Sequence, residues 1–319
     1  MKPLKYLFIS SMLFVATSCG NSWLDLEPST SVDTETSIKI LSDVEFTLNG
    51  IYSTMQSSDA YSGRLVYYGD VTGDDMQAVS STKRVANYYR FNFTKDDNPS
   101  SHWSYLYSII QNCNLILMNI DKLVIDEDDK AYRDDLKGEA LAIRGLALFD
   151  LTRIFGYPYL KDDGASLGVP IIEGLSTIDS KPTRNTVAQC YTKIIDDLTQ
   201  SLSLLGEKFN KGKINKWGAM VLLSRVYLYK GENANALKMA SDAIIGAEKN
   251  KYALWTNEDY PTAWGEDASA SKPGEVLFEI VNLTTDSPGK ESMGYLNSYD
   301  GYDDMCITCL LYTSPSPRD

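Results

Sequence analysis

Apolar residues recur at steps of three and four along most of the chain, and this spacing predicts helices. The first predicted helix spans residues 36–55 and carries on one face Ile38, Leu41, Val44, Leu48, Ile51 and Met55. The same spacing predicts further helices over residues 101–120, 131–155, 187–205, 216–229 and 234–247. The sequence Gly156-Tyr157-Pro158 ends the helix before it, because proline cannot continue a helix.

The last two predicted helices have the spacing of a tetratricopeptide (TPR)-like hairpin. Small residues there, such as Ala236, Ala240 and Ala243, allow two helices to approach closely. An earlier helix carries a similar set, Ala140, Ala142, Gly145 and Ala147. After the helices, residues 275–281 alternate between apolar and polar positions and predict a strand. The predicted fold class is therefore mainly α, with TPR-like helical hairpins, long inserted loops and a few short strands.

Two segments lack a helical period and are rich in aromatic and polar residues. Residues 61–100 predict a long structured loop that contains tyrosine, aspartate, serine and glycine in quantity. Residues 252–271 predict a second loop, which carries Trp255, Tyr260 and Trp264. Loops of this length inside a compact domain are usually functional or disordered. Their aromatic content favours a function.

The charge and the histidine count narrow the classes of function. The 319-residue chain has 30 Lys and Arg against 43 Asp and Glu, a net charge of −13. This acidic balance disfavours binding to nucleic acid, whose phosphates it repels. Histidine occurs once, at His102, whereas tyrosine occurs 21 times. A Ser-His-Asp triad or a multi-histidine metal site would have to use that one residue. This composition favours surfaces that stack on ligands over sites that move protons, and we expect no catalytic residue, metal or cofactor.

Two motifs resemble reactive sites, and we assign both to structure. Residues 164–168 (GASLG) match the G-x-S-x-G nucleophile elbow, which needs a preceding strand, a following helix and a later histidine. Val-Pro follows Gly168 and no histidine follows Ser166, so we predict a turn. Seven Asp-Asp pairs begin at residues 74, 96, 128, 134, 162, 196 and 303. Their spacing fits neither an EF-hand nor a glycosidase, and we expect solvated turns and helix ends, except for Asp74 and Asp75 in the aromatic loop.

The N-terminal residues have the features of an export signal. Lys2 and Lys5 precede an apolar run over residues 6–16, and small residues then lead directly to Cys19. The run is too short to span a bilayer, which needs about 20 residues. This pattern predicts a signal peptide over residues 1–18 and a lipidated Cys19, like a bacterial lipobox. The alternative is an ordinary secretory signal with a chance cysteine.

The C-terminal residues 309–319 have no periodicity and match the translation of a transposase adapter used in DNA sequencing. We therefore expect the native sequence to be cut off near Thr308. Without Cys19 and Cys309, three cysteines remain, an odd number with no C-x-x-C spacing. Cys113 and Cys190 fall in helical patterns, so we predict packed thiols rather than a disulfide or a metal site.

Several segments together resemble the SusD/RagB family of outer-membrane lipoproteins. Residues 19–28 (CGNSWLDLEP) are similar to the lipidated start of that family. The most specific match is residues 138–156 (GEALAIRGLALFDLTRIFG), followed by Gly168-Val-Pro170. Other similar segments, in family order, are residues 67–75 (YYGDVTGDD), 103–107 (WSYLY), 112–114 (NCN), 222–229 (LLSRVYLY) and 275–280 (EVLFEI).

The resemblance implies a lipid-anchored protein on the cell surface of Bacteroidota, at the outer membrane. Members of the family cover a SusC-like TonB-dependent transporter as a lid, bind oligosaccharides and perform no chemistry. They extend beyond this length, so residues 19–308 would be a SusD-like N-terminal region that is incomplete at its C-terminus. The alternatives are a peptide-binding RagB-like receptor, a TPR-like scaffold lipoprotein and a surface glycosidase.

The two aromatic loops are the predicted ligand site. A sugar offers apolar C–H faces to aromatic rings and hydroxyl edges to polar side chains. The candidates for ligand binding are Asp74, Arg84, Tyr88, Tyr89, Trp255 and Trp264. Trp103 has a helical inward position and is expected in the core. The sequence does not name the sugar, because stacking on a ring is tolerant.

Overall fold

The computed structural model describes residues 37–73, 75–94, 100–177, 179–207, 212–263, 274–283, 285 and 287–309. Its helices are α2 (Leu41–Met55), α3 (Arg64–Thr72), α4 (Ala86–Tyr89), α5 (Ser100–Asn119), α6 (Lys130–Phe155), α7 (Val187–Leu204), α8 (Lys216–Lys230), α9 (Asn233–Lys249), α10 (Tyr260–Ala263) and α11 (Met293–Asn297). The short 3-10 helices are η3 (Ile120–Lys122), η4 (Glu127–Asp129), η5 (Tyr159–Lys161) and η7 (Gly289–Glu291). Strand β1 (Met76–Ala78) pairs with β2 (Met305–Ile307). The predicted mainly α fold is therefore confirmed.

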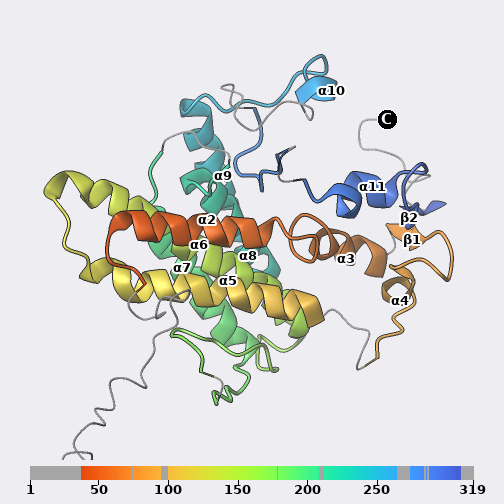
Figure 1. Ribbon diagram of the computed structural model, residues 1–319, viewed down its shortest axis with the longest axis horizontal. Coiled ribbons are helices and arrows are strands. Elements are labelled where there is room, and N and C mark those ends of the chain that lie inside the picture. Colours follow the sequence, from red (N-terminus) through yellow and green to blue (C-terminus); the bar gives the residue numbers. More distant parts are fainter. Residues whose placement is uncertain are drawn as a thin grey trace, which may run out of the picture. The chain divides into compact units, whose positions relative to one another are not determined.

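Helix α6 is the centre of the bundle, and every residue from Gly138 to Thr152 is buried. It packs most extensively against α7 and α5 (Figure 1). The close approach to α7 depends on two glycines, because a Cβ atom on Gly145 would lie 3.0 Å from Cγ of Leu198. A Cβ atom on Gly138 would lie 2.9 Å from Cγ of Leu205. The small residues that the sequence indicated in this helix thus lie in its buried stretch.

Helices α8 and α9 form the predicted hairpin. Gly231 ends α8 in the left-handed conformation (φ 85°), which glycine adopts without steric cost. Asn215 caps the start of α8, since its Oδ1 accepts hydrogen bonds from the backbone nitrogens of Trp217 and Gly218 at 3.1 Å. The Oγ of Ser224 donates to the Ala236 carbonyl at 2.8 Å and ties the two helices together.

The first helix begins later than the pattern predicts, at Leu41 instead of residue 36. The carboxylate of Asp43 explains this boundary, because it accepts hydrogen bonds from the backbone nitrogens of Lys39 (2.8 Å) and Ile40 (3.1 Å). The other predicted helices agree with the structure within two residues at each end. None of the described helices is both long and apolar enough to cross a membrane.

The prediction that residues 61–100 form a loop is wrong for part of this segment, which contains α3, β1 and α4. Helix α3 buries only Tyr67 and Val71, too few apolar positions to show a period. These helices rest on a second hydrophobic cluster that also includes Tyr88, Leu296 and Met305, apart from the main core. In Figure 1, α4, β1, β2 and α11 gather beyond the end of α3. Residues distant in sequence therefore complete this region.

The predicted strand over residues 275–281 is also wrong. Within the ranges that the structure describes, this segment bends at Glu275 and Leu277 and pairs with no strand. Side chains satisfy its carbonyls: Asn215 Nδ2 donates to Leu277 O at 2.6 Å, and Gln56 Nε2 donates to Val281 O. Phe278 and Ile280 do pack together against the main core. The alternation of apolar and polar residues in this segment therefore reflects packing against helices and not pairing with another strand.

Two of the Asp-Asp pairs contradict the expectation of solvated carboxylates. In α7, Asp197 is fully buried, and its two oxygens accept hydrogen bonds from Arg144 Nη2 (2.6 Å) and Nε (2.8 Å). Arg144 Nη1 also donates to Asn114 Oδ1 at 2.9 Å, so the network joins α5, α6 and α7. Asp304 is buried as well and pairs with Arg84. The buried Arg144 and the partly exposed Arg84 supply the charges that water would otherwise balance.

Candidate ligand-binding site

Arg84 is the centre of a side-chain cluster at the tip of the aromatic region. Its Nη2 lies 2.8 Å from Oδ2 of Asp304, and its Nη1 lies 3.1 Å from Oε1 of Glu291. Its guanidinium carbon lies 4.0 Å from the centroid of the Tyr302 ring, a cation–π contact. We call Arg84, Glu291, Tyr302 and Asp304 the Arg84 cluster. The sequence indicated only the first of these residues, because no local pattern links it to residues 291–304.

The second hydrophobic cluster supports the segment that carries Arg84. Tyr88 is buried in it, and the Tyr68 ring packs edge-on at a centroid distance of 5.4 Å. Tyr67 is buried beside them, and this burial raises the pKa of its phenol to about 12. The rings of Tyr67 and Tyr88 therefore support the surface from inside.

Exposed aromatic side chains lie around the second hydrophobic cluster. Tyr89 and Phe91 are exposed on the α4 side, and Tyr299 is 89% exposed on the side of α11. Phe91 has φ 54°, a left-handed conformation that is strained for a residue other than glycine. Tyr302 packs edge-on against Tyr295 at 5.1 Å, so its orientation is fixed. Exposed rings beside paired charges form a surface suited to a ligand with both apolar faces and polar edges.

The structure brings together only part of the predicted site. Arg84, Tyr88 and Tyr89 lie in one region, whereas Trp255 lies near Tyr260 at a ring distance of 6.1 Å. In Figure 1, α10, which begins at Tyr260, is well separated from α4. The candidates Asp74 and Trp264 lie outside the described residues, as do Cys19, the signal peptide 1–18 and residues 310–319.

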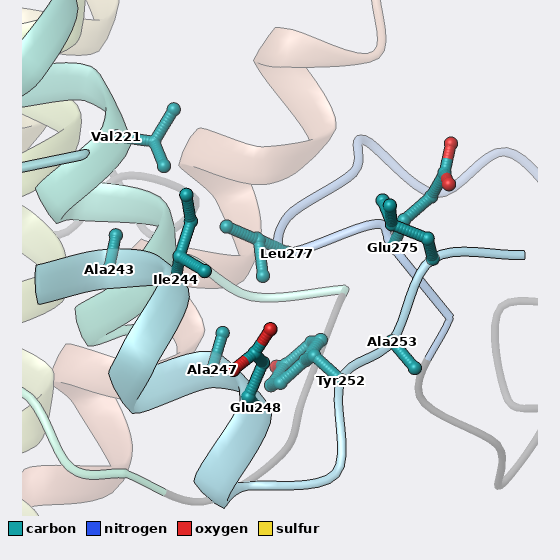
Figure 2. A pocket seen from close by; sticks show the side chains of 10 residues that line it. Val221, Ala243, Ile244, Ala247, Glu248, Tyr252, Ala253, Glu275 and Leu277 are labelled. Atoms are coloured by element: carbon teal, nitrogen blue, oxygen red, sulfur yellow. The ribbon is translucent and has the colours of Figure 1, made fainter. Parts of the chain in front are cut away.

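A cavity of about 240 Å³ lies between the α8–α9 hairpin and residues 252–254, 275 and 277. Figure 2 shows its apolar lining, with Val221, Ala243, Ile244 and Leu277 on one side. Glu248 lies beside Tyr252 in this view, and Glu275 stands at the opposite end. This cavity offers apolar contact and little polar recognition.

The described part of the chain supports the assignment of the reactive motifs to structure. A turn over residues 162–164 follows η5, and the Ser166 hydroxyl donates to Asp162, so the predicted turn is confirmed at the start of the motif, whereas Leu167 forms an isolated bridge with Thr186. His102 is buried, and burial lowers the pKa of its imidazole. Cys113 and Cys190 are buried free thiols, as predicted. No group of three or more potential metal ligands occurs among the residues that were placed.

Comparison with known proteins agrees with this architecture. Residues 22–228 match the SusD-like family model described as "Starch-binding associating with outer membrane". The chain belongs to this SusD-like family. A crystal structure of a putative sugar binding protein from Bacteroides vulgatus is 82% identical, with a TM-score of 0.85 over 87% of this chain and 62% of that one. A SusD superfamily protein from the same species is 37% identical, with a TM-score of 0.80 over 86% of this chain and 62% of that one.

Among curated proteins, SusD-like protein P2 of Formosa agariphila is 28% identical over 94% of this chain and 57% of its own length. The chain thus spans about three fifths of the length of SusD-like protein P2 and of the putative sugar binding protein. The family assignment confirms the resemblance that the sequence motifs indicated, and it accounts for the TPR-like helical bundle.

Proposed function

We propose that the protein captures oligosaccharides at the cell surface and delivers them to a SusC-like TonB-dependent transporter, over which it acts as a lid. A lipid on Cys19 anchors it in the outer membrane, and it releases its ligand without chemical change. The family description, starch-binding and associating with the outer membrane, supports this role.

The observation that carries the proposal is the juxtaposition of exposed aromatic rings with the Arg84 cluster. Tyr299 and Tyr89 are exposed, and the Tyr302 ring contacts both Arg84 and Tyr295. Aromatic faces accept the C–H surface of a pyranose, and the exposed carboxylate of Glu291 accepts hydrogen bonds from its hydroxyls. The relative with 82% identity carries the description of a putative sugar binding protein. A laminarin-binding SusD-like protein shares the fold.

Isothermal titration calorimetry with a panel of neutral oligosaccharides tests the proposal. We expect a ligand whose affinity falls about fivefold in Tyr302→Ala and in Tyr299→Ala, because one aromatic contact contributes about 1 kcal/mol. Tyr132→Ala is the matched control, since Tyr132 is an exposed tyrosine on α6. The proposal fails if no glycan binds, or if the three variants bind a glycan equally well. Binding of peptides alone would favour a RagB-like receptor.

A further inference from the structure

A second cavity, of about 310 Å³, opens at the C-terminal end of α6. Four tyrosines contribute to its walls: Tyr157, Tyr159 in η5, Tyr191 in α7 and Tyr229 in α8. Arg153 of α6 lies among them. None of the residues of the Arg84 cluster lines this cavity, and neither does Trp255.

The hydroxyl of Tyr191 is the first sign that the cavity binds something. The side chain lines the cavity and Tyr191 is only 3% exposed. Its ring is fixed by edge contacts with Tyr159 (5.1 Å) and Phe149 (6.0 Å). Within the part of the chain that the structure places, no group forms a hydrogen bond with its hydroxyl. Burial raises the pKa of Tyr191 to about 12, so the hydroxyl remains a donor. Because the hydroxyl itself is not fully buried, it is open to the cavity, where a ligand or water can accept its hydrogen bond.

The charges around the cavity are the second sign. Its lining contains Arg153 and no carboxylate, in a chain whose net charge is −13. Lys161 Nζ lies 3.4 Å from the centroid of the Tyr157 ring, and Lys230 Nζ lies 5.7 Å from that of Tyr159. Arg153 and Lys230 have acidic partners, Asp150 and Glu232. Lys161 forms no ion pair with any residue that the structure describes.

Donors therefore dominate the lining: tyrosine hydroxyls, a guanidinium group and a nearby ammonium group. Such a set is complementary to a carboxylate, which accepts hydrogen bonds only. The volume lies at the lower end of the range for small-molecule sites, about 300–1,000 Å³, which fits a single ring. The aromatic walls fit the apolar face of that ring.

We infer that this cavity binds a sugar ring that carries a carboxylate, such as the uronate residue of an acidic polysaccharide. The carboxylate lies toward Lys161 and Arg153, and the ring hydroxyls lie toward Tyr191 and Tyr159. This site shares no residue with the Arg84 cluster, so the inference goes beyond the proposed function and does not depend on it.

Calorimetry on the whole chain tests the inference with D-glucuronate, its neutral methyl ester, D-glucose and benzoate. We expect D-glucuronate to bind at least tenfold more tightly than the ester or glucose, and more tightly than benzoate. Tyr191→Phe removes only the hydroxyl, and Lys161→Gln removes only the charge. Each should weaken the binding of D-glucuronate at least fivefold, and Lys161→Gln should also reduce its salt dependence.

The controls separate this site from the other. Tyr132→Phe removes a tyrosine hydroxyl elsewhere on α6, and Tyr302→Ala alters the Arg84 cluster, so neither should change the binding of D-glucuronate. The inference is overturned if D-glucuronate does not bind, if the ester or benzoate binds as tightly, or if both cavity variants behave like the parent. The neutral oligosaccharide panel, measured on the same variants, reports on the proposed function separately.

Discussion

The buried pair Arg144–Asp197 gives the sharpest prediction for stability. Asp197→Ala removes a carboxylate that accepts two charge-assisted hydrogen bonds from Arg144, at 2.6 and 2.8 Å. The guanidinium group would keep only its bond to Asn114, in a site closed to water. Removing one partner of a buried pair costs about 3–5 kcal/mol, because the remaining charge is left uncompensated. Lys193 lies 3.2 Å from the same carboxylate and would also lose a partner.

Asp196→Ala is a matched control, since Asp196 is the exposed neighbour of Asp197 in the same helix. Urea denaturation followed by circular dichroism should show a loss of about 3–5 kcal/mol in the free energy of unfolding for Asp197→Ala. Asp196→Ala should stay within about 0.5 kcal/mol of the parent. The double variant Arg144→Met/Asp197→Leu removes both charges and should recover most of the loss. Equal stabilities for the two single variants would refute the assignment of a buried, structural ion pair.

Three further predictions concern packing, pH and the anchor. Ala140→Leu and Ala147→Leu should each lower the free energy of unfolding by about 1–3 kcal/mol, because both alanines are buried in α6; an unchanged melting temperature in both would contradict this. Burial raises the pKa of Glu139 from 4.5 to about 7, so its protonated form stabilises the fold below pH 4.5 and this contribution is lost as the pH rises through about 7. Urea unfolding should show this decline in the parent and not in Glu139→Gln. Cys19→Ala should abolish metabolic labelling with a fatty acid, and labelling that persists would mean that Cys19 is not the lipidated residue.

The helical part of the fold could be predicted because its signals are local. The boundaries of α6 and α7 follow from apolar spacing and from Gly156-Tyr157-Pro158, and in the structure Thr186 caps the start of α7. Each signal lies within a few residues of the boundary that it determines. The buried Asp197 escaped prediction because its partner lies on another helix, and an Asp-Asp pair gives no sign of which carboxylate faces inward.

The Arg84 cluster depends on contacts that no local pattern encodes. Arg84 and Asp304 are 220 positions apart, and the second hydrophobic cluster likewise joins α3 and α4 to residues 293–305. Composition singled out Tyr88 and Tyr89 together, but a helix turns about 100° per residue, so neighbours face different surroundings. Tyr88 is buried and Tyr89 is exposed. Composition identifies an aromatic region, whereas burial decides which rings a ligand can reach.

The arrangement of the two hydrophobic clusters also makes binding and folding separable by experiment. The main core and the cluster beneath Arg84 share no buried residue. Tyr299 is 89% exposed beside the smaller cluster, so its truncation should change the free energy of unfolding by less than about 0.5 kcal/mol. Loss of one stacking contact should cost about 1 kcal/mol of binding. A variant that loses affinity and keeps its unfolding curve therefore reports on the ligand surface, whereas Asp197→Ala lowers binding only as far as it unfolds the bundle.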